Sequence, residues 1–259
     1  MISAPQCVRT APRRVLLLGG TREARALATR LAQEETIATT LSLAGRTSAP
    51  LASELPTRVG GFGGALGLKR YLLEEKIDRV VDATHPFAEQ ISANAREACR
   101  ALGVPLAVLA RAPWRREAGD CWIEVAGNVE AAFALGEAPR RVFLTIGRLG
   151  VKDFRAAPQH RYLLRSIDPP APDELPPGSE VILARGPFAV EDEIALMRAK
   201  GVEILVTKNS GGAMTYAKIE AARALKLPVV VIAPPPIGDA LRVDDIDAAL
   251  DFLRAPGAT

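Results

Sequence analysis

The feature that most constrains the fold is a short apolar run that ends in two glycines and leads straight into a helical pattern. Val15-Leu16-Leu17-Leu18 is followed by Gly19-Gly20-Thr21 and then by Ala, Arg and Glu residues at positions 22–28. A buried strand, a glycine turn and a helix make up half of a βαβ unit, and such a turn directs backbone N–H groups toward an anion. The pattern predicts a phosphate site, at which Thr21 either caps the helix or donates to the phosphate. Its predicted contacts are Gly19, Gly20, Thr21, Arg22 and Glu23.

A second element indicates which nucleotide binds. The glycines alone also fit a plain turn, because Gly-Gly-Thr lacks the full G-x-G-x-x-G spacing. After the strand-like run Ile37–Leu43, however, the position at which an NAD site usually carries an acid carries Arg46 instead, beside Thr47 and Ser48. A guanidinium beside two hydroxyls suits a 2′-phosphate. We therefore predict NADP(H) rather than NAD(H), with a solvated loop arginine as the alternative.

Composition limits the possible partners. The chain has 259 residues, 48% of them hydrophobic, and a net charge of +3 spread without a basic tract. These values indicate a globular α/β protein, no nucleic-acid partner and compatibility with an acidic substrate. No apolar run approaches the length of a membrane span, so we expect no membrane partner. A monomer is compatible with the sequence, which does not determine the oligomeric state.

The cysteines and histidines predict neither disulfides nor a metal site. Cys7, Cys99 and Cys121 are odd in number and lie far apart, and His85 and His160 are the two histidines. No C-x-x-C or H-x-x-x-H spacing is present. The first apolar run is too short for the core of a signal peptide. We therefore expect no bound metal and a location in the reducing cytoplasm.

Short apolar runs alternate with helical patterns, which is typical of parallel sheets covered by helices. The predicted fold is α/β, with two Rossmann-like halves, mostly parallel sheets and a cofactor cleft between them. Expected strands are Val15–Leu18, Ile37–Leu43, Arg58–Val59, Arg79–Ala83, Leu106–Leu109, Val142–Ile146, Tyr162–Ile167, Val181–Ala184, Ile204–Thr207 and Val229–Ile232. Expected helices after the first are Ala65–Glu75, Ala88–Leu102, Val190–Lys200, Met214–Leu225 and Asp244–Leu253.

The same pattern predicts where the halves begin and end. We expect a flexible tail at 1–13, an NADP-binding domain at 14–112, a connecting region at 113–140, a substrate-side domain at 141–240, and a C-terminal helix and tail at 241–259. The proline-rich segment Asp168–Gly178 is predicted to be a stiff surface loop, because proline is excluded from helix interiors and central strands.

Polar clusters follow several strands of the first half, where ligands of such folds collect. Asp82 ends one strand, and the turn that follows is expected to contact ribose or nicotinamide. The alternative is that Thr84 or His85 only caps the next helix. Gly60–Gly64 precedes another helix and either approaches the ligand closely or forms a plain turn. Predicted cofactor contacts here are Gly61, Phe62, Ala83, Thr84, His85 and Pro86.

Three clusters follow strands of the second half, and each presents a cation or a hydrogen-bonding group beside glycine. Together Arg148, Arg185 and Lys208 predict a site for carboxylates or phosphate, with scattered solvated charges as the alternative. The predicted substrate contacts are Thr145, Gly147, Arg148, Arg185, Gly186, Asn209, Ser210, Gly211 and Gly212.

Three motifs together resemble the precorrin-6A reductase family of cobalamin biosynthesis: Leu18-Gly19-Gly20-Thr21 with Glu23-Ala24-Arg25, Asp82-Ala83-Thr84-His85-Pro86-Phe87-Ala88 and Thr207-Lys208-Asn209-Ser210-Gly211-Gly212. The resemblance runs from about Arg14 to Ile237. It implies NADPH-dependent reduction of a double bond of the macrocycle precorrin-6A, giving precorrin-6B (dihydroprecorrin-6). Relatives in the anaerobic pathway reduce the cobalt-bearing macrocycle, and this distinction stays open.

The resemblance also implies roles for single residues. The substrate carries many carboxylates, which Arg148, Arg185 and Lys208 are expected to hold. We assign Lys208 and Asp82 to the catalytic centre: Lys208 passes a proton or only clamps a carboxylate, and Asp82 orients the nicotinamide end together with Thr84 and His85.

Other functions remain open at this stage. A short-chain reductase needs Tyr-x-x-x-Lys, but Tyr71, Tyr162 and Tyr216 are followed at that spacing by Glu75, Ser166 and Glu220. Another NADPH-dependent reductase, or an NADP-sensing protein without turnover, remains an alternative.

Overall fold

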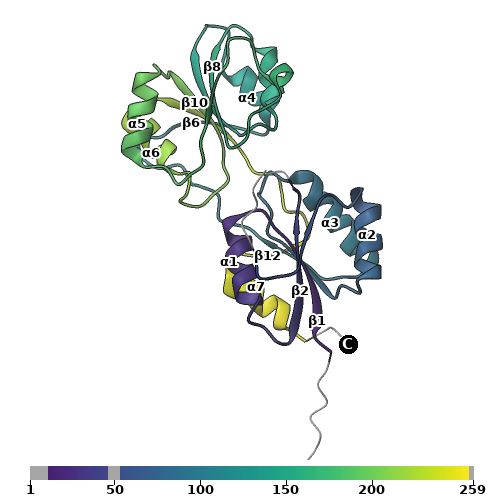
Figure 1. The fold of residues 1–259 in the computed structure, drawn as a ribbon. Helices are drawn as coiled ribbons and strands as arrows, with labels where there is room; N and C mark the ends of the chain where they lie inside the picture. Colours follow the sequence, from purple (N-terminus) through teal and green to yellow (C-terminus); the bar gives the residue numbers. More distant parts are fainter. Residues whose placement is uncertain (1–10, 46–52, 257–259) are drawn as a thin grey trace, which may run out of the picture. The chain divides into compact units, whose positions relative to one another are not determined.

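The computed structural model describes residues 11–45 and 53–256, which form two compact units (Figure 1). The first unit contains the described parts of Met1–Ala110 and Ile237–Thr259, and the second contains Arg111–Pro236. Each unit has its own sheet of six strands. The α/β class and the parallel sheets predicted from sequence are confirmed, because every strand pair in both sheets is parallel.

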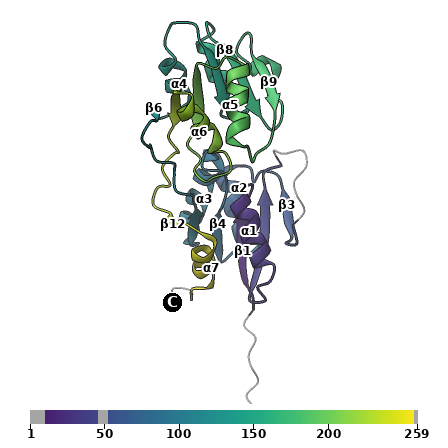
Figure 2. The same ribbon diagram turned by 90° about the vertical axis from the view of Figure 1, so that its left-hand side faces the viewer.

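The first sheet has the strand order β12-β5-β4-β1-β2-β3. This order corresponds to the 3-2-1-4-5-6 order of dinucleotide-binding folds, in which ligands bind where the order reverses, here between β1 and β4. β3 lies at the edge of this sheet (Figure 2). The strands are β1 (Arg13–Leu18), β2 (Ile37–Leu43), β3 (Thr57–Val59), β4 (Arg79–Asp82), β5 (Leu106–Leu109) and β12 (Leu241–Val243).

Helices cover both faces of the first sheet, so its central strand β1 is apolar and buried from Val15 to Leu18. Val15 and Leu17 pack in one core cluster with α1 (Arg22–Leu31) and α7 (Ile246–Arg254). Leu16 and Leu18 pack in another with α2 (Gly64–Glu74) and α3 (Glu89–Leu102). A strand buried on both faces needs a continuous hydrophobic run, which explains residues 15–18.

The second sheet repeats this order with a different chain connection. Its order is β6-β11-β10-β7-β8-β9. If the strands are numbered from β7 as the first, the order read from β9 is again 3-2-1-4-5, and β6 occupies the position of the sixth strand. In the first unit the sixth strand comes from the end of the chain, whereas in the second it precedes the other five. The strands are β6 (Cys121–Val125), β7 (Arg141–Thr145), β8 (Arg161–Ser166), β9 (Glu180–Leu183), β10 (Ile204–Lys208) and β11 (Pro228–Ile232).

Helices α5 (Val190–Ala199) and α6 (Ala217–Ala224) pack on one face of this sheet with Phe143, Leu163 and Leu205. Figure 1 shows α4 (Asn128–Ala134) on the other side of the sheet. The 3-10 helix η1 (Val151–Ala156) packs against α4.

The structure differs from the sequence prediction in the segment 113–140, which was expected only to connect the halves. It contains β6 and α4, and β6 pairs with β11 as an edge strand of the second sheet. In β6 only Trp122 is fully buried, so this strand lacks a clear hydrophobic pattern.

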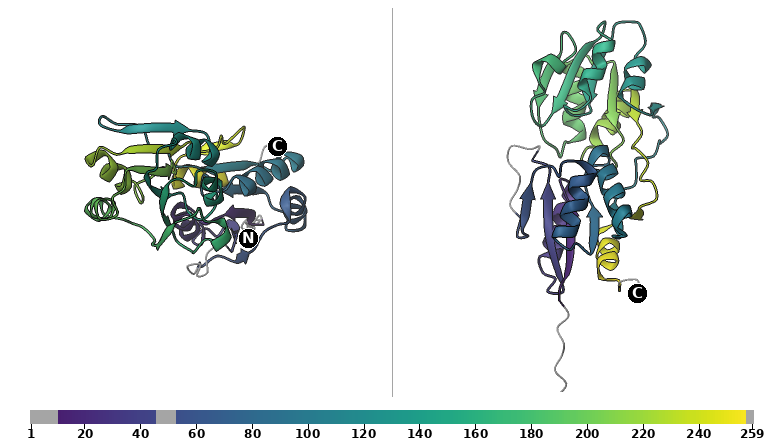
Figure 3. Two further views of the ribbon diagram at one scale, coloured as in Figure 1. Left: turned by 90° about the horizontal axis from the view of Figure 1, so that it is seen from above. Right: turned by 90° about the vertical axis from the view of Figure 1, so that its right-hand side faces the viewer.

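The C-terminal residues belong to the first unit, whereas the sequence predicted a separate helix and tail at 241–259. β12 pairs with β5, and α7 packs against α1 in the first unit, as the yellow helix in Figure 3 shows. Two local predictions were also inaccurate. α6 begins at Ala217 instead of Met214, and the proline-rich loop contains a short 3-10 helix, Pro172–Glu174.

Candidate functional site

The Gly19-Gly20-Thr21 turn lies at the carboxyl end of β1, where the strand order reverses. A Cβ atom on Gly19 would lie 2.7 Å from Cδ1 of Leu41, so the packing of β1 beside β2 requires glycine there. Gly20 has φ +131°, a conformation that side chains rarely adopt, and a Cβ there would meet open space. The turn therefore has one glycine for packing and one that leaves the backbone open to a ligand.

Thr21 caps α1, as predicted. Its Oγ1 accepts a hydrogen bond from the backbone N–H of Ala24 at 3.1 Å and donates to the carbonyl of Ala83 at 2.7 Å. The second bond joins the glycine turn to the loop after β4. Because the hydroxyl hydrogen goes to Ala83, Thr21 does not donate to a phosphate in this arrangement. The N-terminus of α1 lies at this turn, and the positive end of its helix dipole suits it to an anion.

Asp82 and Thr84 form a local polar unit at the same edge. Asp82 is 2% exposed, and its Oδ1 accepts from the backbone N–H of Thr84 at 3.0 Å and from the Thr84 hydroxyl at 2.6 Å. The charge of this carboxylate adds to the effect of burial in raising the pKa of Cys99 to about 12. In this structure Asp82 therefore orients Thr84.

The turn that follows directs His85 outward. Its Nδ1 accepts from the backbone N–H of Phe87 at 3.2 Å, which leaves Nε2 as the protonated nitrogen of the neutral ring. His85 is exposed, and Ala83 is buried behind it. The structure therefore brings the glycine turn and the Asp82–Pro86 segment together at adjacent strands, with Leu18 and Asp82 in register.

Arg58 was not identified from the sequence and occupies a central position beside the Gly60–Gly64 loop. Its guanidinium donates to Oγ of Ser42 at 2.8 Å and to the carbonyls of Gly60 and Gly61 at 3.0 and 3.1 Å. It also lies 3.8 Å from the ring centroid of Phe62. Arg58 thus holds the loop that contains the predicted contacts Gly61 and Phe62. An arginine four residues before an aromatic residue in a glycine-rich loop was the available signal. Arg46, Thr47 and Ser48 lie outside the described residues.

In the second unit, the Lys208–Gly212 loop is packed against the chain at residues 111–114. Asn209 is 8% exposed; its Oδ1 accepts from the N–H of Trp114 at 2.7 Å and its Nδ2 donates to the Trp114 carbonyl at 2.9 Å. A Cβ on Gly211 would lie 2.4 Å from the carbonyl oxygen of Ala112. The contacts with residues 112 and 114 therefore explain why asparagine and glycine occupy positions 209 and 211. The sequence did not reveal this packing role, because the partners are distant along the chain.

The remaining predicted substrate residues lie at the same edge of the second sheet. Thr145 ends β7 and donates from Oγ1 to the carbonyl of Val206 on β10 at 3.0 Å. Arg148 follows β7, Lys208 ends the neighbouring β10, and the exposed Arg185 follows β9 at the sheet edge. Because the strands are parallel, all three cations lie at the carboxyl ends of the strands. Arg185 is farther from the other two, because β8 lies between β7 and β9.

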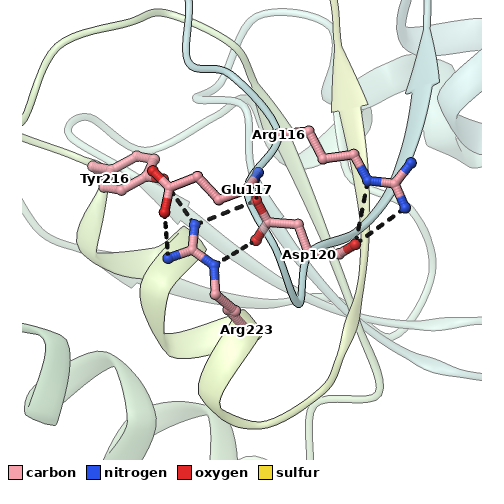
Figure 4. Close-up of polar contacts among 5 residues, drawn as sticks. All are labelled: Arg116, Glu117, Asp120, Tyr216 and Arg223. Atoms are coloured by element: carbon pink, nitrogen blue, oxygen red, sulfur yellow. Dashed lines mark hydrogen bonds and ion pairs between the residues drawn. The ribbon is translucent and has the colours of Figure 1, made fainter.

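A polar cluster fixes the segment before β6 on α6 (Figure 4). Arg223 contacts Asp120 at 2.8 Å and Glu117 at 3.1 Å, and it donates to the Tyr216 hydroxyl at 2.8 Å. Hydrogen bonding to Asp120 raises the pKa of Arg223, while burial raises the pKa of Tyr216. Arg116 closes the turn by donating to the Asp120 carbonyl at 3.2 and 3.3 Å. This cluster was not predicted from sequence, because 113–140 was interpreted as a connection.

The described residues contain neither a group of metal-binding side chains nor a membrane-spanning helix. No group of three or more His, Cys, Asp or Glu side chains in 11–45 and 53–256 is arranged to hold a metal ion. No helix in the same ranges is both long and apolar enough to cross a membrane.

Comparison with known proteins identifies the family. The family described as precorrin-6x reductase CbiJ/CobK matches residues 14–254. A precorrin-6A reductase from Rhodobacter capsulatus is 47% identical over 246 residues, which cover 95% of this chain and 98% of that protein. A solved structure of CobK precorrin-6A reductase is 48% identical, covers 95% of this chain and 98% of its own, and superposes with a TM-score of 0.86.

A cobalt-precorrin-6A reductase from Salmonella typhimurium is less similar, at 30% identity over 85% of this chain and 87% of that protein. The family match extends through α7, beyond the Arg14–Ile237 region in which the motifs first indicated the resemblance. The chain belongs to the precorrin-6x reductase family CbiJ/CobK.

Proposed function

We propose that this protein reduces one double bond of precorrin-6A, with NADPH as the reductant, in cobalamin biosynthesis. The observation that carries the proposal is the identity of 47% to a precorrin-6A reductase over 95% of this chain. The lower identity of 30% to a cobalt-precorrin-6A reductase favours the metal-free macrocycle as substrate.

The first unit provides the features that fit a nicotinamide dinucleotide. Gly20 leaves its Cβ position open, and the N-terminus of α1, the positive end of the helix dipole, favours a pyrophosphate. Asp82 holds Thr84 beside this turn, where Thr84 and His85 orient the nicotinamide end. NADPH, when bound, supplies a hydride. Arg46, with Thr47 and Ser48, is proposed to bind the 2′-phosphate that distinguishes this cofactor.

The second unit provides cations for an anionic macrocycle. Arg148, Arg185 and Lys208 lie at one edge of the sheet, and their charges favour the encounter with substrate carboxylates. Reduction of the double bond adds one hydride and one proton to the macrocycle and leaves NADP⁺. Lys208 is proposed to pass that proton, and the support is that it ends β10 directly before Asn209, whose amide is anchored on both sides to Trp114.

The function is tested by mixing the purified full-length protein with precorrin-6A and NADPH. We expect equimolar loss of NADPH and formation of precorrin-6B, followed by absorbance and mass spectrometry. Omission of either reactant is the control. Binding of NADPH and the macrocycle without turnover would instead support an NADP-sensing protein.

The assignment of Arg46 predicts a cofactor-specific loss. Arg46→Ala is expected to weaken NADPH binding by about 1.5–3 kcal/mol, on the order of 10- to 100-fold in Kd, because a charge-assisted contact to the 2′-phosphate is removed. NADH binding should stay nearly unchanged, as measured by calorimetry with both cofactors. Arg70→Ala, at an exposed arginine on α2, is the matched control. An equal loss of affinity for NADPH and NADH would exclude the assignment.

A further inference from the structure

A group of three buried, mutually interacting charged side chains lies in the second unit, outside the residues assigned to the reaction. Arg165 on β8, Glu193 on α5 and Lys218 on α6 are 7%, 2% and 5% exposed. Arg165 donates with both terminal nitrogens to the Glu193 carboxylate, one of these bonds being 3.0 Å. Its guanidinium also lies 3.8 Å from the ring centroid of Phe188. Glu193 is therefore already neutralised, and Lys218 is an additional buried cation.

Lys218 contacts an aromatic ring. Its Nζ lies 5.3 Å from the ring centroid of Trp114, within the range at which a desolvated ammonium group and an indole attract each other. Burial is the largest cause that lowers the pKa of Lys218 to about 7, the charge of Arg165 lowers it further, and Glu193 opposes both. The side chain therefore changes its charge near neutral pH.

Trp114 connects this amine to the candidate substrate loop. Its indole Nε1 donates to the carbonyl of Gly212 at 2.7 Å. Its backbone N–H and carbonyl bind the two ends of the Asn209 amide. Displacement of the indole removes the hydrogen bond to Gly212, and the two bonds to Asn209, which directly follows Lys208, depend on the position of the Trp114 backbone.

We propose that Lys218 is a positioning residue for the reduction of precorrin-6A, which holds Trp114 and through it the Lys208–Gly212 loop. This inference rests on the proposed function. Charged Lys218 is the productive form, because only the ammonium group attracts the indole face. A purely structural role gives a different result, because replacing a buried charge by an apolar side chain of similar size is often neutral or stabilising.

The first test measures steady-state kinetics of Lys218→Met at pH 6.5. We expect KM for precorrin-6A to rise about tenfold and KM for NADPH to remain unchanged, while thermal unfolding shows a folded protein. Lys218→Arg retains a cation and should keep KM near that of the original protein. Lys152→Met, at an exposed lysine of η1, is the matched control. Combining Lys218→Met with Trp114→Phe should raise KM no further than Trp114→Phe alone.

The second test uses fluorescence and does not depend on a Lys218 variant that folds. The chain has two tryptophans, so Trp122→Phe leaves Trp114 as the sole reporter. We expect its emission to change with pH with a midpoint near 7, and KM for precorrin-6A to rise as pH increases through the same range. Where Lys218→Met folds, it serves as an additional control and should lack the fluorescence transition.

The outcomes separate this inference from the proposed function. If the unmodified protein does not reduce precorrin-6A, the proposed function is wrong. If it does, but Lys218→Met leaves KM within twofold, the positioning role alone is wrong. If Lys218→Met does not fold, the fluorescence titration decides: a transition near pH 7 supports the role and a flat titration overturns it.

Discussion

Lys208→Ala is expected to lower kcat for the reduction of precorrin-6A by about 10²- to 10⁴-fold, the usual contribution of a positioned acid or base. The residue ends β10 beside Thr145, at the point where the order of the second sheet reverses. If Lys208 also binds a substrate carboxylate, Lys208→Ala should in addition raise KM for the macrocycle. The measurement is NADPH oxidation at saturating precorrin-6A, so that kcat is separated from binding.

Lys208→Arg distinguishes the two roles assigned to this side chain. Arginine retains the positive charge but does not release a proton near neutral pH, because its pKa lies above about 12. If Lys208 passes the proton, Lys208→Arg keeps a KM near normal and a low kcat. If Lys208 only clamps a carboxylate, Lys208→Arg recovers kcat. Unchanged turnover of Lys208→Ala would remove the residue from the chemistry.

Glu193→Leu is expected to reduce the free energy of unfolding of the second unit by about 3–5 kcal/mol, because it leaves Arg165 buried without its counter-ion. The two side chains are 6% and 2% exposed, so water does not compensate for the lost partner. Lys218 adds a second nearby cation whose repulsion is no longer offset. Urea unfolding followed by tryptophan fluorescence reports on this unit, since Trp114 and Trp122 both lie within it.

Two further variants make this prediction specific. The double variant Arg165→Met with Glu193→Leu removes both charges and should recover most of the loss. Glu180→Gln breaks a more exposed pair with Lys200 and should cost less than about 1 kcal/mol. A cost for Glu193→Leu no larger than that for Glu180→Gln would show that the buried pair does not stabilise the unit.

The best sequence predictions concern elements whose pattern is local. β2 and β5 match the expected ranges at both ends, and Thr21 caps α1 as expected. These features depend on strand hydrophobicity and on a cap three residues from its partner, which are visible in a short window. β6 and β12 were missed because they are short edge strands with few buried side chains, and their partners lie far along the chain.

The candidate site shows the same division. The sequence predicted that the glycine turn and Asp82–Pro86 follow strands of one half, and the structure joins them through Thr21 and Ala83. It did not predict Arg58, whose role depends on the carbonyls of Gly60 and Gly61 and the ring of Phe62. Nor did it indicate that Asn209 binds Trp114, because that contact spans 95 residues.

The sequence by itself determined the parallel α/β class, the positions of the loops that follow the strands, and the family resemblance, because hydrophobic periodicity and short motifs are properties of neighbouring residues. Only the tertiary structure decided that the chain ends in the first unit, that β6 completes the second sheet, and that a buried lysine contacts Trp114. Strand pairing and burial are produced by contacts between distant residues, and their free energy depends on which side chains the fold brings together.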